Sequence, residues 1–98
     1  MLDKLAAIKA RFDELGIALT NPEVVSDNKK YTLLSKEYRS LEKIVKIRSL
    51  YAKVLDDIDF NREMINSDDL EMRELAKEEL PGLQEQKDKL EKQIRTML

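Results

Sequence analysis

Apolar residues recur every three or four positions along most of this chain, which is the spacing of one face of an α-helix. The first set precedes a glycine, Gly16, that has the place of a C-terminal cap. Its members are Leu2, Leu5, Ile8, Phe12 and Leu15. The pattern predicts a first helix of about fifteen residues that ends at Gly16.

A corner is predicted after the first helix. Asn21 has the character of an N-cap and Pro22 that of a first helical residue, where its missing amide costs nothing. We expect one short helical turn here, and a main helix that starts at Ser26 or Asp27.

The main helix is predicted over residues 28–65, which contain neither glycine nor proline. It carries a heptad-like seam formed by Tyr31, Leu34, Tyr38, Leu41 and Val45. Farther on, apolar positions cover more than one face: Ile44, Val45, Ile47, Leu50, Tyr51, Val54, Leu55 and Ile58. This girdle indicates packing between two neighbouring helices, and an exposed partner-binding patch is the alternative.

A returning helix is predicted from Asp68 to the end of the chain. Asp68 and Glu71 have the spacing of a capping box. Pro81 and Gly82 interrupt the pattern, because proline cannot donate an amide to the carbonyl four residues earlier. We expect a kink there, or a helix that ends near Glu79 and restarts at Pro81; a loop between two short helices is the alternative.

Together these patterns predict an all-α fold over residues 1–98 as one domain. The expected architecture is an elongated helical bundle, an antiparallel coiled-coil-like hairpin with an additional N-terminal helix.

The composition narrows the possible chemistry. The chain has no His and no Cys, so the commonest general base and the thiolate metal ligand are both missing. Its two glycines are too few for a phosphate-binding loop. We expect no catalysis, no metal, no cofactor and no small-molecule ligand. No apolar run approaches the roughly 20 residues of a membrane span, so no membrane contact and a cytoplasmic location are expected.

Charge is unevenly distributed. Residues 28–54 hold eight bases and two acids, whereas residues 56–91 hold five bases and thirteen acids. Basic residues of the main helix recur seven apart, opposite the seam. We name four of them the cationic stripe, as a candidate nucleic-acid contact: Lys36, Arg39, Lys43 and Lys46. The alternative is an ordinary solvated helix face.

Three segments carry a resemblance to a known family: MLDKLAAIKARFDEL, SDNKKYTLLSKEYRSLEKIVKIRSLY and DLEMRELAKEELPGLQEQKDKLEKQI. Together they resemble the N-terminal domain of bacterial class I peptide chain release factors, in the release factor 1 group that reads UAA and UAG. The similarity runs through essentially the whole chain, and no short motif is diagnostic by itself.

The resemblance implies a non-catalytic domain that positions a translation termination factor on the ribosome. The implied partners are the GTPase-associated region of the large ribosomal subunit and the class II release factor. With this resemblance, the cationic stripe becomes a candidate ribosome contact. The implied hydrolysis of peptidyl-tRNA belongs to a Gly-Gly-Gln loop in another domain, and no matching residue is present here, because Gly16 and Gly82 stand far apart.

Three other identities are compatible with the same sequence. The paralogous factor that reads UAA and UGA shares the architecture. An independent RNA-binding arm of the seryl-tRNA synthetase type has similar length, but it lacks a separate first helix packed alongside. A structural coiled-coil module is the third, and the interruptions of the helical pattern favour a folded-back monomer over it.

Overall fold

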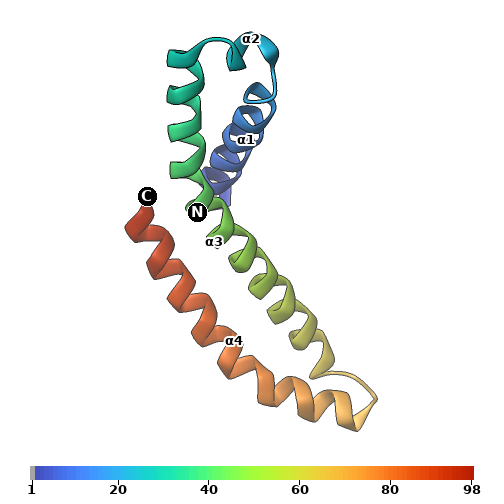
Figure 1. The fold of residues 1–98 in the computed structure, drawn as a ribbon. Helices are drawn as coiled ribbons and strands as arrows, with labels where there is room; N and C mark the ends of the chain where they lie inside the picture. The colour runs from blue at the N-terminus through green and yellow to red at the C-terminus, as the bar shows by residue number, and fades with distance from the viewer. Residues whose placement is uncertain (1) are drawn as a thin grey trace. The chain divides into compact units, whose positions relative to one another are not determined.

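The computed structural model describes residues 2–98, and they form four helices (Figure 1). These are α1 (Leu2–Ala18), α2 (Pro22–Val25), α3 (Asn28–Met64) and α4 (Leu70–Met97). The chain divides into two compact units, Met1–Lys46 and Ile47–Leu98, which we call the N-terminal and C-terminal units. The predicted all-α class, with a hairpin of long helices and an additional N-terminal helix, is confirmed.

In the N-terminal unit, α1 packs against the first part of α3 (Figure 1). The rings of Phe12 and Tyr38 stack with centroids 4.3 Å apart and planes inclined by 15°. Leu15 is only 1% exposed. Phe12 and Leu15, from the predicted apolar set, therefore face the neighbouring helix, whereas Leu2 of the same set is 46% exposed. Burial of this face stabilises a helix that would be marginal alone.

The prediction that Gly16 ends the first helix is wrong. The helix continues to Ala18, and the amide of Leu19 still donates to the carbonyl of Leu15 at 2.9 Å. No glycine has the positive φ angle that a glycine cap uses. A Cβ at Gly16 would stand 3.6 Å from Cε2 of Tyr38, an ordinary van der Waals distance, so the glycine lies beside the Tyr38 ring.

The predicted corner is confirmed. Asn21 caps α2 by accepting a hydrogen bond from the amide of Glu23 at 3.0 Å, and Pro22 occupies the first helical position. Asp27 then accepts from the amide of Lys30 at 3.2 Å, at the start of α3. Val24, buried on α2, anchors the corner.

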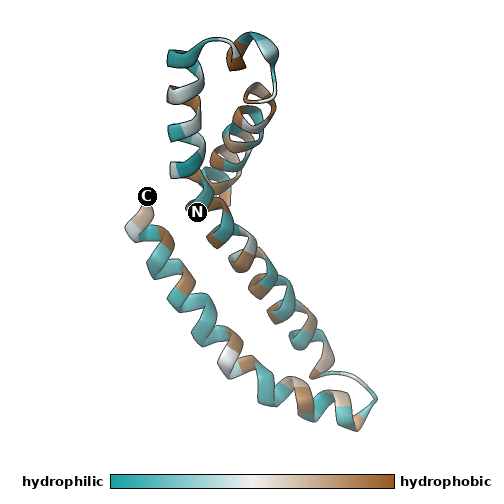
Figure 2. Cartoon of the chain, viewed as in Figure 1, coloured by the Kyte–Doolittle hydropathy of each residue, from teal (hydrophilic) through white to brown (hydrophobic). Residues whose placement is uncertain are grey.

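In the C-terminal unit, α4 runs antiparallel to the rest of α3 (Figure 1). Hydrophobic positions recur along both helices among polar ones (Figure 2). The buried apolar residues are Tyr51, Val54 and Ile58 on α3 with Ala76 and Ile94 on α4. The interpretation of the girdle as a helix-packing surface is therefore confirmed for these positions, whereas Leu50 stays 53% exposed.

The turn between α3 and α4 differs from the prediction by one residue. Asp69, not Asp68, is the N-cap, and its carboxylate accepts from the amides of Glu71 at 2.9 Å and Met72 at 3.4 Å. The hydroxyl of Ser67 in turn accepts from the amide of Asp69 at 3.1 Å. This contact holds Asp69 in the extended conformation that an N-cap requires.

Pro81 neither ends α4 nor opens a loop, because the helix is continuous from Leu70 to Met97. Figure 1 shows α4 changing direction in its orange part, and Pro81 is a proline inside this continuous helix, so the predicted kink is the correct alternative. Pro81 and Gly82 are exposed, whereas Leu80 and Leu83 are half-buried. The proline thus lies on the solvent side, where a helix tolerates a missing hydrogen bond best.

Candidate nucleic-acid interface

The four residues of the cationic stripe lie on α3 within the N-terminal unit. All four side chains are exposed: Lys36, Arg39, Lys43 and Lys46. Leu34, Tyr38 and Leu41, from the seam, are half-buried, and Val45 is buried. An α-helix has 3.6 residues per turn, so the spacing of the stripe residues places them on one side of α3. The seam residues lie on the opposite side, which is the more buried one.

Two carboxylates lie within residues 28–54, and both are paired with cations. The guanidinium of Arg11 on α1 binds Glu37 through two bonds, Nε to Oε1 at 2.8 Å and Nη2 to Oε2 at 2.9 Å. These hydrogen bonds hold the pKa of Glu37 below its ordinary value. The pair turns the Glu37 carboxylate towards α1 and away from the stripe.

Glu42, the second carboxylate, pairs along α3. Its Oε1 lies 3.1 Å from Nζ of Lys46, whose side chain is 73% exposed. An exposed pair of this kind contributes little stability, so Lys46 is available to another anion. In the described residues, Lys36, Arg39 and Lys43 form no salt bridge. The stripe therefore presents three unengaged cations and a fourth that is weakly held.

Hydroxyl groups accompany the first part of the stripe. One shallow hollow on α3 is lined by Tyr31, Thr32, Ser35, Lys36 and Arg39. A second hollow shares Thr32 and Lys36 with it and includes Lys29. Sequence reasoning overlooked Thr32 and Ser35, although their helical spacing places them beside Lys36 and Arg39. Hydroxyls and cations together are the groups that bind phosphate oxygens.

The exposed cations of the stripe can bind an anionic partner. The stripe has fixed spacing on a helix, and its lysines and arginine are donors without acceptor atoms. Such a face fits a polyanion whose charges repeat along its length. Within residues 2–98 no cluster of three or more acidic side chains is placed to hold a metal ion, and no helix has the length and apolar character of a membrane crossing.

Comparison with known proteins identifies the family. Residues 8–98 match the PCRF domain. The whole chain is 44% identical to part of peptide chain release factor 1 from Cytophaga hutchinsonii and 44% identical to that from Parabacteroides distasonis. Identity to peptide chain release factor 1 from Helicobacter pylori strain G27 is 45%.

The chain spans 28% of the length of the Cytophaga protein and 27% of the other two. No solved structure matches it. The family match covers nearly all of the chain, and the resemblance to the N-terminal part of peptide chain release factor 1 is confirmed. The chain therefore belongs to the PCRF domain family.

Proposed function

We propose that this chain is the ribosome-positioning N-terminal domain of a peptide chain release factor that acts at UAA and UAG stop codons. In this proposal the domain is not itself catalytic. It orients the factor on the ribosome, while hydrolysis of peptidyl-tRNA belongs to another domain of the intact factor.

One observation carries the proposal: the whole chain aligns at 44% identity with a protein named peptide chain release factor 1. Two structural features agree with it. The first helix packs against α3 through Phe12 and Tyr38, unlike a synthetase arm of two helices. The cationic stripe also gives the domain a surface for ribosomal RNA.

The proposed contact is made by Lys36, Arg39, Lys43 and Lys46 against the GTPase-associated region of the large subunit. The class II release factor is the second proposed partner, since a domain held near that region can influence its action. The stripe supports a ribosomal contact because its two nearest carboxylates are already paired.

Charge reversal tests the contact. The triple variant Lys36→Glu, Lys43→Glu, Lys46→Glu should reduce co-sedimentation of the chain with ribosomes by at least about tenfold at low salt, because repulsion replaces phosphate binding. All three side chains are exposed, so the variant should stay folded by circular dichroism.

A matched control changes the charge equally at exposed lysines away from the stripe: Lys4→Glu, Lys30→Glu, Lys77→Glu. It should keep at least half of the co-sedimentation. If both triple variants lose binding equally, only net charge matters and the stripe is not the contact. If neither loses binding, the domain is held by another surface.

A further inference from the structure

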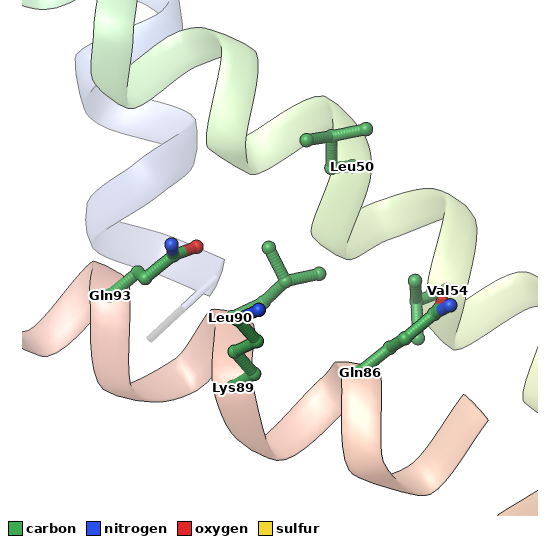
Figure 3. Close-up of a pocket in the computed structure, with 6 residues that line it drawn as sticks. All are labelled: Leu50, Val54, Gln86, Lys89, Leu90 and Gln93. Carbon is green, nitrogen blue, oxygen red and sulfur yellow. The ribbon is translucent and has the colours of Figure 1, made fainter. Parts of the chain in front are cut away.

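Two neighbouring hollows lie along the last turns of α4 in the C-terminal unit. The first, of about 330 Å³, is lined by Leu50 and Val54 from α3 and by Gln86, Lys89, Leu90 and Gln93 from α4 (Figure 3). The second is lined by Lys92, Gln93, Thr96 and Met97. Because Gln93 belongs to both, they form one surface, which we call the hairpin groove.

The floor of the hairpin groove is apolar and open to water. Leu50 is 53% exposed and Met97 is 40% exposed. Figure 3 shows the side chain of Leu90 pointing from α4 towards α3, with Gln86 and Gln93 to either side of it. Covering these side chains would remove apolar surface from water, which is favourable.

The charged residues that line the hairpin groove are positive, whereas the C-terminal unit as a whole has a negative net charge. Residues 47–98 hold thirteen carboxylates and nine bases, yet no carboxylate lines either hollow. Lys89 and Lys92 form no salt bridge in the part of the chain that the structure describes. On α3, exposed Lys53 stands one turn after Leu50. The apolar floor therefore has the cations Lys89 and Lys92 at its edge, and the carboxylates of Glu85 and Asp88, one helical turn before them on α4, lie outside the lining of both hollows.

A nearby carboxylate is already engaged. Glu91 lies between Lys89 and Lys92 in the sequence, but its Oε2 accepts a hydrogen bond from the hydroxyl of Tyr51 at 2.8 Å. That bond is directed into the α3–α4 interface. A ligand that supplies carboxylates would thus meet Lys89 and Lys92 without competition from Glu91.

The dimensions fit a helix. From Gln86 to Met97, α4 rises about 16 Å, which is three helical turns. A groove between two helices accepts an amphipathic helix through apolar residues three and four positions apart. We infer that the hairpin groove docks an acidic amphipathic helix of a partner protein, whose apolar face covers Leu50, Leu90 and Met97 and whose carboxylates pair with Lys89 and Lys92. This site is separate from the cationic stripe and does not depend on the proposed ribosome contact.

Two designed peptides test the inference. Each has about 18 residues, with leucines three and four apart; one carries glutamate beside the leucines and the other lysine. Titration into the isotope-labelled 98-residue chain, followed by amide chemical shifts, should show saturable binding of the acidic peptide. The shifts should concentrate at residues 50–54 and 86–97. The basic peptide should bind at least about tenfold more weakly.

Matched variants locate the site. Leu50→Asp and Lys89→Glu should each weaken binding of the acidic peptide at least about tenfold. The controls Leu75→Asp and Lys77→Glu alter residues that are similarly exposed on α4, outside the groove. They should leave the dissociation constant within about twofold. Helical circular dichroism of all four variants should match that of the parent chain.

Three results would overturn the inference. The first is no saturable binding of the acidic peptide. The second is equal binding of the basic peptide, which would show that the cations Lys89 and Lys92 select nothing. The third is concentration-dependent self-association that Leu50→Asp abolishes, which would assign the groove to a second copy of this chain.

Discussion

Tyr51 shows how one residue joins the two helices of the C-terminal unit. Its side chain is 5% exposed, and its hydroxyl donates to Oε2 of Glu91 at 2.8 Å. Burial raises the pKa of Tyr51 first, and the hydrogen bond to Glu91 raises it further. Ionisation of this phenol would place a second negative charge beside the carboxylate in a partly dry interface.

Removing the hydroxyl should therefore weaken the fold. Tyr51→Phe keeps the ring but leaves Glu91 without this donor, and we expect a loss of about 1 to 3 kcal/mol in the free energy of unfolding at neutral pH. Glu91 is only half-buried, so water can replace part of the bond. Urea denaturation measures the loss, with Tyr31→Phe as the control, because Tyr31 is 40% exposed and should lose less than about 0.5 kcal/mol.

Tyr51 also makes the stability of the fold depend on pH in the alkaline range. Because the pKa of Tyr51 is raised in the folded state, its stabilising effect is complete below the ordinary tyrosine value of 10.0 and is lost as pH rises through the folded value. The difference in stability between the parent chain and Tyr51→Phe should thus shrink above pH 10. A difference that stays constant through this range would show that the phenol does not titrate with folding.

The sequence pattern predicted that Tyr51 is buried, but it did not predict the hydrogen bond to Glu91. The girdle placed Tyr51 among residues that pack against another helix, because periodicity reports which face of a helix is apolar. The bond to Glu91 joins residues that are 40 positions apart. Such a contact depends on the register between two helices, which no local pattern contains.

At the scale of elements, the sequence predicted all four helices and missed details of their ends. Gly16 and Pro81 both carry strong local signals to stop a helix, yet α1 and α4 continue through them. Both positions lie beside partly buried apolar side chains: the ring of Tyr38 is next to Gly16, and the half-buried Leu80 and Leu83 flank Pro81 and Gly82. Local propensity is a weak preference that burial of an apolar face can override.

Gly82 gives a direct test of the continuity of α4. Its φ angle is negative and a Cβ there would meet no heavy atom within 4 Å. Gly82→Ala should therefore stabilise the chain by about 0.5 to 1 kcal/mol, because alanine loses less backbone entropy on entering a helix. Thermal and urea unfolding give the change.

The opposite substitution provides the contrast. Gly82→Pro would remove a second successive amide from the helix and should destabilise the chain by about 3 kcal/mol or more. A destabilising Gly82→Ala would contradict a helical conformation at residue 82. Equal effects of alanine and proline would show that α4 is already broken there.

At the scale of the whole molecule, charge is the main signal that the sequence provides. The net charge of −2 conceals nine bases and seven acids in residues 1–46 against nine bases and thirteen acids in residues 47–98. The sequence located the stripe and carried the family resemblance, since both depend on residue identity and spacing. It could not locate the hairpin groove, because a groove exists only where two helices fix the distance between their side chains.

The salt dependence of ribosome binding tests whether the stripe meets phosphates. The logarithm of the association constant falls linearly with the logarithm of the salt concentration. Each phosphate contact adds about 0.7 to the magnitude of this slope. The neutral variant Lys36→Gln, Lys43→Gln, Lys46→Gln should therefore lower that slope by about 2. Lys4→Gln, Lys30→Gln, Lys77→Gln is the matched control and should leave the slope within about 0.5. A stripe that binds protein instead of RNA releases fewer condensed counterions. Neutralising it would then weaken binding with little change in the slope. That result would contradict a phosphate contact and favour a protein contact.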